Sequence, residues 1–259
     1  MVQNLSSVHP DAKIGRNVTI SPFVTIEKNV VIGDNTYIYP NVVIMDGARI
    51  GKNCRIFPGA VIAGIPQDLK FQGEETTAEI GDGTIIRECA TVNRGTAAKD
   101  KTVVGNECLL MAYSHVAHDC ILGNNVILGN ATQLAGEVEV DDYAIVSGGT
   151  LVHQFTRIGK HVMIQGGSRI GKDIPPYIVV GREPITYSGV NIIGLRRRGF
   201  DNETISAIQD IYRILYQSGL NYKEAVKQIE ETIPYSVEKE NIVSFIQNSQ
   251  RGIVRGYFE

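Results

Sequence analysis

Aliphatic residues recur at every sixth position along most of this chain. The pattern runs through residues 8–62, returns over 80–92, and continues without a break over 104–170. A period of six fits neither an amphipathic helix, which repeats every 3.6 residues, nor a strand, which alternates every two. A fixed repeat of this kind indicates a solenoid in which each repeat is one short strand followed by a turn.

The remaining positions of the six-residue repeat predict a triangular prism. The residue four places after each aliphatic is usually small, as at Ala48, Ala60 and Ala90, so that large and small inward side chains together fill a narrow interior. Gly often follows the aliphatic residue and Asn comes two places later, as in Gly15 and Asn17, which suits tight corners. Three repeats would form one coil, so 25 repeats predict about eight coils.

We therefore expect a mainly β chain folded as a parallel β-helix of hexapeptide repeats. This class is the left-handed exception to the rule that parallel crossovers are right-handed, so we expect left-handed coils.

Composition narrows the classes of function. The formal net charge of −3 gives no general attraction to nucleic acid or to an anionic membrane. No apolar run approaches the roughly 20 residues of a membrane span, and the first ten residues lack the features of a secretion signal. Cys54, Cys108 and Cys120 occupy small inward positions, which favours core packing over metal binding or disulfides. A cytoplasmic location is the resulting expectation.

The repeat is interrupted at residues 65–79 and 96–102, and functional loops project from such places in solenoids. It ends near Ile174, where Pro175 and Pro176 are expected to stop the ladder of strands.

Beyond Leu195 the pattern becomes helical. Asp201, Asn221 and Ser236 each precede an apolar pattern of helical spacing and are expected to cap three helices. We predict a β-helix domain over residues 1–194 and a three-helix domain over residues 195–259.

The candidate chemistry lies at one corner of the predicted prism. His115 and His118 flank the inward Val116, so both should project outward. One coil of 18 residues beyond His118 is Gly136, and two coils beyond is Gln154, at about 5 and 10 Å along the axis. An imidazole that acts as general base, with a glycine N–H that stabilises an oxyanion, is typical of acyl transfer.

Two other interpretations of these histidines remain open. They could be zinc ligands, although hexapeptide-repeat carbonic anhydrases use a wider spacing and a third His, or they could be purely structural. His9 and His161 lie at turn positions and are expected to be solvated surface residues.

Seven segments, among them HVAHDC (115–120) and GLRRRGF (194–200), resemble those of the UDP-N-acetylglucosamine O-acyltransferase family, which catalyses the first step of lipid A biosynthesis. The resemblance extends over essentially the whole chain, and HVAHDC followed by GLRRRGF is a highly specific combination. The matching segments are QDLK (67–70), NRGT (93–96), HVAHDC (115–120), VHQF (152–155), HVM (161–163), IPPY (174–177) and GVNIIGLRRRGF (189–200).

The resemblance implies a left-handed β-helix homotrimer with active sites in the clefts between subunits. It implies that His118 is the catalytic base, that Asp119 orients the imidazole, and that Gly136 forms the oxyanion hole, which agrees with the column found above. It further implies substrate contacts from Asp68, Lys70, His115, Gln154, Asn191, Arg197 and Arg198, and an acyl-chain groove at Met163 and Gly166.

The expected reaction transfers a (3R)-hydroxyacyl group from acyl carrier protein to the 3-hydroxyl of UDP-N-acetylglucosamine. It needs no metal and no resident cofactor, because the carrier protein brings the acyl-phosphopantetheine. Three positions differ from the family pattern: Glu137 and Asn93 each stand where the family has His, and Ile193 replaces an acidic nucleotide contact.

Two alternatives remain. The N-acyltransferase of the same pathway carries an additional N-terminal uridine-binding domain, whereas here the repeat has begun by Val8. A non-enzymatic β-helix scaffold would bind no UDP-sugar.

Overall fold

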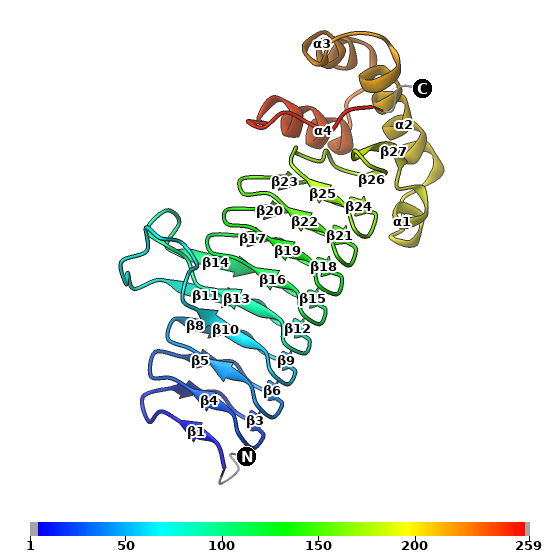
Figure 1. Ribbon diagram of the computed structural model, residues 1–259. Helices are drawn as coiled ribbons and strands as arrows, with labels where there is room; N and C mark the ends of the chain where they lie inside the picture. The colour runs from blue at the N-terminus through cyan, green and yellow to red at the C-terminus, as the bar shows by residue number, and fades with distance from the viewer. Residues whose placement is uncertain (1–4, 257–259) are drawn as a thin grey trace.

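The computed structural model describes residues 5–256 and forms a long three-sided prism with a helical tail at one end (Figure 1). Three parallel sheets of short strands make its sides, and the chain visits them in turn, so that each coil contributes one strand to each sheet. The strands β1 to β25 correspond to the 25 predicted repeats.

The first sheet has nine strands: β1 (Ser7–Val8), β4 (Thr25–Ile26), β7 (Val43–Ile44), β10 (Val61–Gly64), β13 (Thr91–Asn93), β16 (His115–Val116), β19 (Gln133–Leu134), β22 (Leu151–Val152) and β25 (Arg169–Ile170). The second has eight: β2 (Lys13–Ile14), β5 (Val31–Ile32), β8 (Ala48–Ile50), β11 (Thr77–Ile80), β14 (Lys101–Val104), β17 (Ile121–Leu122), β20 (Glu139–Val140) and β23 (Arg157–Ile158). The third has ten: β3 (Thr19–Ile20), β6 (Tyr37–Ile38), β9 (Arg55–Ile56), β12 (Ile85–Ile86), β15 (Leu109–Leu110), β18 (Ile127–Leu128), β21 (Ile145–Val146), β24 (Met163–Ile164), β26 (Ile178–Gly181) and β27 (Thr186–Val190).

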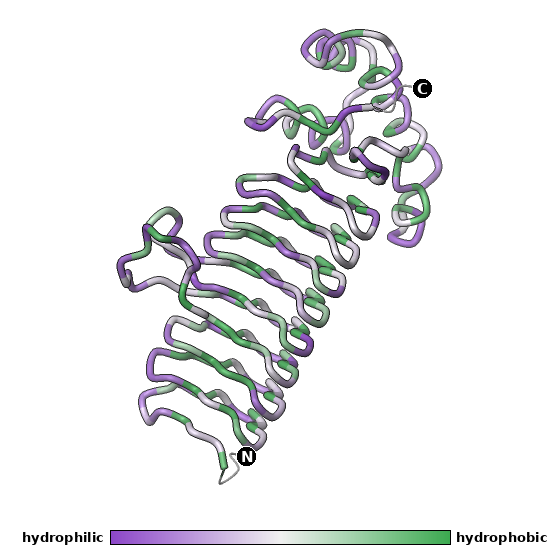
Figure 2. Tube along the Cα trace, in the orientation of Figure 1, coloured by the Kyte–Doolittle hydropathy of each residue, from purple (hydrophilic) through white to green (hydrophobic). Residues whose placement is uncertain are grey.

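The core is a column of the aliphatic residues found at every sixth position. All of them are buried except Val8 and Ile14, which lie in the first coil and are partly buried against the same core. Figure 2 shows hydrophobic residues recurring on coil after coil. Because each inward side chain packs on its equivalents in the coils above and below, the hydrophobic repeat alone fixes the register of the prism.

The three edges of the prism carry the turns. We call them the first edge (from the first to the second sheet), the second edge (from the second to the third) and the third edge (from the third back to the first). At the second edge, Asn17 and Asn35 adopt the expected left-handed backbone, with φ of 58° and 60°. A Cβ on Gly33 would lie 2.6 Å from the Gly51 backbone, so the close stacking of coils there requires glycine.

Both interruptions of the repeat project from the first edge, at the left of Figure 1. The first is shorter than predicted, because residues 77–79 already belong to β11, and the second lies two residues earlier, because β13 ends at Asn93 and residues 101–102 belong to β14. The irregular segments are therefore residues 65–76, which we call the long loop, and residues 94–100, which we call the short loop.

The expectation that Pro175 and Pro176 end the strand ladder is wrong. The two prolines lie in the turn that follows Ile174, where no ladder hydrogen bond needs their missing N–H, and β26 then pairs with β24 in parallel. The strand β27 returns antiparallel to β26 and leads into the tail.

Within residues 5–256 the tail contains four helices, the three predicted ones and an additional short helix before them. They are α1 (Ile192–Arg197), α2 (Asn202–Gln217), α3 (Tyr222–Thr232) and α4 (Val237–Gln247). The predicted caps of α2, α3 and α4 are confirmed, because Asp201, Asn221 and Ser236 each accept a hydrogen bond from a main-chain N–H of the first turn. The additional α1 spans the predicted domain boundary at residues 194 and 195. No helix in the described part of the chain is both long and apolar enough to cross a membrane.

Candidate active site

The predicted column of His118, Gly136 and Gln154 lies on the first edge. The strand register places His115 beside Gln133, and Gln133 beside Leu151, on neighbouring coils. The residues three places further along each coil, His118, Gly136 and Gln154, are therefore equivalent. The long and short loops leave the same edge, so the repeat brings all these segments together.

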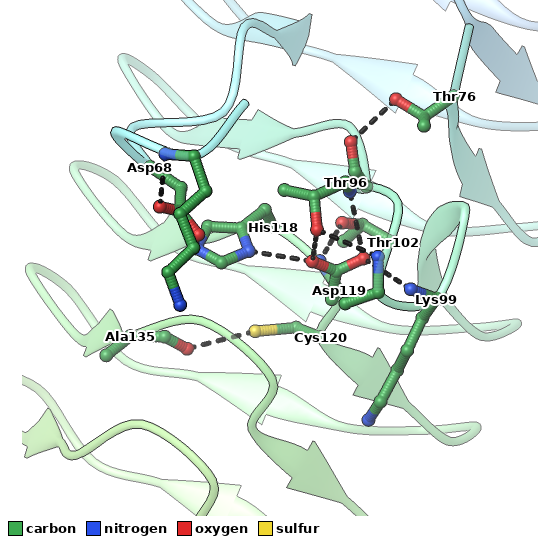
Figure 3. A network of polar contacts seen from close by, with 12 residues as sticks. Asp68, Thr76, Thr96, Lys99, Thr102, His118, Asp119, Cys120 and Ala135 are labelled. Carbon is green, nitrogen blue, oxygen red and sulfur yellow. Dashed lines mark hydrogen bonds and ion pairs between the residues drawn. The ribbon is translucent and has the colours of Figure 1, made fainter. Parts of the chain in front are cut away.

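His118 and Asp119 form a buried pair (Figure 3). His118 is 7% exposed and Asp119 is fully buried, and Nδ1 of the imidazole lies 2.8 Å from Oδ2 of the carboxylate. In the neutral ring, this contact places the proton on Nδ1 and leaves the lone pair on Nε2. The pair thus has the arrangement of a general base held by a carboxylate.

The short loop holds the other side of the Asp119 carboxylate. The main-chain nitrogens of Thr96 and Lys99 lie 2.9 and 3.2 Å from Oδ1, and the Thr96 hydroxyl lies 2.7 Å from Oδ2. A buried carboxylate needs such donors, because it has no water to replace them. The sequence marked the segment as an interruption but did not identify Thr96 or Lys99 as partners of Asp119.

Gly136 lies against the edge of the imidazole. A Cβ at this position would come within 2.5 Å of both Cε1 and Nε2 of His118, so a side chain there would displace the ring. Gly136 is buried, and its N–H donates to no acceptor among residues 5–256. A free main-chain donor beside Nε2 is the arrangement that an oxyanion hole requires.

The long loop brings Asp68 to the free side of the imidazole. Its Oδ2 lies 3.9 Å from Nε2 of His118, and its Oδ1 accepts a hydrogen bond of 2.9 Å from the main chain of Lys70, whose side chain is exposed. Asp68 and Gly136, two predicted site residues from distant parts of the sequence, therefore both lie beside Nε2 of His118.

His115 lies beside this group and is bonded at Nδ1 to the hydroxyl of Thr91, at 2.7 Å. Burial, and to a lesser extent the neighbouring His118, lowers the pKa of His115, which keeps it neutral at physiological pH. Within residues 5–256 no three His, Cys, Asp or Glu side chains gather closely enough to hold a metal ion.

Two of the positions that differ from the family pattern lie close to the loops. The amide nitrogen of Asn93 lies 3.1 Å from the carbonyl of Ile65, which anchors the start of the long loop to β13. Glu137 follows Gly136 and lines a cavity of about 460 Å³ together with Lys99 and Phe155.

The basic segment lies on the second edge, away from His118. The Arg198 guanidinium donates to the carbonyl of Tyr143, at 3.1 Å, and lies 5.3 Å from the centre of that residue's ring. Arg197 is exposed. Asn191 is buried, caps α1 through Gly194 and donates to the carbonyl of His161. Ile193, the third position that differs from the family pattern, is 67% exposed on α1.

The expectation that His161 is a solvated surface residue is wrong, whereas His9 is exposed as predicted. His161 is 8% exposed because its ring stacks between Tyr143 and Tyr177, with centroids 4.9 and 5.6 Å apart, and Phe200 covers its edge. Tyr177 and Phe200 lie beyond the regular repeat, and Phe200 belongs to the tail, so the hexad position alone could not reveal this cover.

The two residues expected to line an acyl groove lie on the third sheet and in the turn that follows it, on the third edge. Met163 is half-buried on β24, and Gly166 is exposed in the turn that follows. Within one chain the predicted site residues thus occupy three different edges: the His118 column on the first, Arg198 on the second and Gly166 on the third.

Comparison with known proteins decides the family. The protein is 43% identical over 199 residues, 75% of this chain and 76% of the other, to the acyl-[acyl-carrier-protein]–UDP-N-acetylglucosamine O-acyltransferase of Burkholderia lata. A relative of the same name from Pseudomonas entomophila is 44% identical over 189 residues, 73% of each chain. This chain belongs to the UDP-N-acetylglucosamine O-acyltransferase family. It is therefore an acyltransferase, which excludes the scaffold alternative.

Family models and solved structures agree with this assignment. A model described as "Udp N-acetylglucosamine O-acyltransferase; Domain 2" matches residues 173–254, and one described as "Bacterial transferase hexapeptide (six repeats)" matches residues 29–64 and 101–136. The structure of a UDP-N-acetylglucosamine acyltransferase from Bacteroides fragilis is 61% identical with a TM-score of 0.97, covering 98% of this chain and all of the other. The Francisella novicida enzyme is 44% identical with a TM-score of 0.96, covering 98% and 94%. The left-handed β-helix expected for the hexapeptide class is thereby confirmed.

The buried His161 predicts a pH-dependent stability. Burial, with smaller contributions from the charges of Arg198 and Lys160, lowers its pKa from 6.5 to about 4. Between these values the unfolded chain binds a proton that the folded chain excludes, so stability falls as the pH drops from 6.5 to 4, by up to about 3 kcal/mol. We expect His161→Phe, which keeps a ring in the stack, to lose this part of the acid sensitivity. The free energy of unfolding of the wild type and of the variant would be measured by urea denaturation at pH 7.5 and 4.5. An equal loss of stability at the lower pH in both proteins would contradict the assignment of this acid sensitivity to His161.

Proposed function

We propose that this protein transfers a (3R)-hydroxyacyl group from acyl carrier protein to the 3-hydroxyl of UDP-N-acetylglucosamine, the first step of lipid A biosynthesis. The single observation that carries the proposal is the buried pair of His118 and Asp119 beside the free N–H of Gly136. The names of the relatives, which specify the acyl donor and acceptor of those enzymes, support it. Four cysteines without disulfides suit a cytoplasmic location.

The mechanism follows from the orientation of the imidazole. Nε2 of His118 takes the proton of the sugar 3-hydroxyl while its oxygen attacks the thioester carbonyl. The ring becomes an imidazolium, which the Asp119 carboxylate stabilises through Nδ1, and the Gly136 N–H donates to the oxyanion. When the tetrahedral intermediate collapses, the C–S bond breaks and the imidazolium returns its proton to the leaving thiolate of the phosphopantetheine.

The residues around this pair are proposed to hold the substrates. Asp68 and Lys70 on the long loop, with His115, would contact the sugar, since Asp68 already lies 3.9 Å from Nε2. Gln154, two coils beyond His118, is half-buried on the same edge and would contact the acyl donor.

We further propose a homotrimer with sites between subunits. Asn191, Arg197 and Arg198 are proposed to bind the UDP moiety, and a guanidinium fork suits a diphosphate. They lie on the second edge and the catalytic pair lies on the first, so a second copy must bring its second edge to the first edge of its neighbour. Two cavities of about 510 and 750 Å³ are larger than the one lined by Glu137, and none of the proposed site residues lines them. This agrees with a substrate site that a single chain does not complete.

The acyl chain is proposed to lie along the third edge of a neighbouring subunit. A Cβ added to Gly166 would lie 3.1 Å from the carbonyl of Gly148, and the residue is exposed. Together with Met163 it would form the floor of a groove whose length depends on side-chain size.

His118→Ala tests the reaction. We expect kcat to fall about 10²- to 10⁴-fold, the usual range for loss of a general base, with an unchanged folded structure. Acyltransfer from a panel of acyl carrier protein thioesters to UDP-N-acetylglucosamine would be measured, with His9→Ala as control because His9 is exposed on a distant coil. A His118→Ala variant with near-normal turnover would disprove the assignment.

Mixing two impaired variants tests the trimer. If each site combines His118 of one subunit with Arg198 of its neighbour, trimers refolded from equal amounts of His118→Ala and Arg198→Ala chains contain about a quarter intact sites. We expect activity to reappear in the mixture, although each parent alone is inactive or binds UDP-sugar poorly. A mixture no more active than the average of the parents, or an active monomer in sedimentation, would contradict the proposal.

Gly166→Met tests the groove. The added side chain would exclude several methylenes of a long acyl chain from apolar surface, at about 0.8 kcal/mol each, so preference should move to shorter chains. The measurement is the ratio of kcat/KM for long and short acyl thioesters, and with Gly in place we expect a preferred chain of about fourteen carbons or more. An unchanged ratio in a folded variant would show that Gly166 only permits a tight turn and does not set the acyl length.

A further inference from the structure

The Thr96 hydroxyl shares one carboxylate oxygen with the catalytic histidine. Both Thr96 Oγ1 and His118 Nδ1 contact Oδ2 of Asp119, at 2.7 and 2.8 Å (Figure 3). Thr96 Oγ1 also accepts from the N–H of Ala98, at 3.2 Å, which occupies a lone pair and directs the hydroxyl proton toward Asp119. Thr96 is 7% exposed, so water does not replace this donor.

The short loop is fastened at both ends. Before Thr96, the carbonyl of Gly95 accepts from the Thr76 hydroxyl at 2.6 Å, and the Gly95 N–H donates to the Thr77 carbonyl. After it, the Lys99 ammonium pairs with Glu139 at 3.2 Å. The donors of the loop are therefore held in place rather than left to follow the carboxylate.

We propose that Thr96 is a positioning residue of the acyl transfer, which holds the Asp119 carboxylate as an oriented anion so that only Nε2 of His118 is presented to the substrate. The proposal rests on the proposed function in one respect, that His118 is the general base. Thr96 itself is placed to contact Asp119 and is assigned no contact with substrate.

The proposal predicts the sign of a measurable change. With its proton the pair of His118 and Asp119 has no net charge, and without it the pair is an anion. A hydroxyl that donates to the carboxylate stabilises the anionic state more, so its removal makes the pair hold its proton to higher pH. Other titratable residues beside the pair are Asp68 on the long loop, His115 on β16 and Lys99 on the short loop, and all of them stay unaltered in this test.

The experiment compares Thr96→Val, which keeps the shape and removes the donor, with Thr96→Ser, which restores the hydroxyl. Thr84→Val is the matched control, because Thr84 is also a buried threonine, and its hydroxyl donates to a carbonyl on the second edge. The titration of His118 is followed by NMR of the unliganded protein with labelled histidine, and kcat and KM are measured separately.

In Thr96→Val we expect the midpoint of the His118 titration to rise by about half a pH unit or more. We expect kcat to fall about tenfold with KM for UDP-N-acetylglucosamine within about twofold, because the substrate contacts are intact. Thr96→Ser and Thr84→Val should keep the wild-type midpoint. A midpoint that stays or falls in Thr96→Val, or that moves equally in Thr96→Ser, overturns the proposal. The titration needs no substrate, so a wild-type protein without acyltransferase activity would refute the proposed function separately.

Discussion

The structure depends on one repeated contact, between an inward aliphatic side chain and its equivalents in the neighbouring coils. These side chains form a continuous buried column, and their stacking sets the pairing of every strand in β1 to β25. Because the pairing is fixed, the place of a residue within its hexad decides which edge it occupies and whether it points inward. His118, Gly136 and Gln154 have little in common as residue types, yet they meet because they hold the same place on successive coils.

The regular repeat positions the catalytic pair, and the two loops that interrupt the repeat supply several of the groups that contact it. A carboxylate as fully buried as that of Asp119 costs a great deal of free energy unless donors surround it. The turn that contains Asp119 offers few such donors, and the short loop one coil away supplies three. The long loop brings Asp68 to the opposite side of the imidazole. Both irregular segments therefore act on one side chain that the regular part positions.

The sequence predicted what the repeat determines and missed what depends on loop or tail conformation. The column at the first edge follows from counting in steps of 18, and the helix caps follow from local chemistry. The contact of Thr96 with Asp119 depends on the path of an irregular loop, which no period encodes. The prediction for His161 was wrong because its hexad position does point out of the prism, but Tyr143 on the same edge, Tyr177 from the turn before β26 and Phe200 from the tail together bury it. The assignments of Arg198 and Gly166 came from family resemblance, since they concern edges that a single chain keeps apart.

The three-sided coil also constrains how the length of such a chain can change during evolution. Loss of one hexad would rotate everything after it by one edge, which would move Gly136 and Gln154 away from the His118 column while leaving the core well packed. Loss of a complete coil would keep all edges aligned and only shorten the column. The loops at 65–76 and 94–100 leave an edge and return to it, so they can lengthen or shorten without altering that alignment. Natural variation in chain length should therefore concentrate in such loops and in whole coils, and single-hexad changes should be rare even though they conserve the fold.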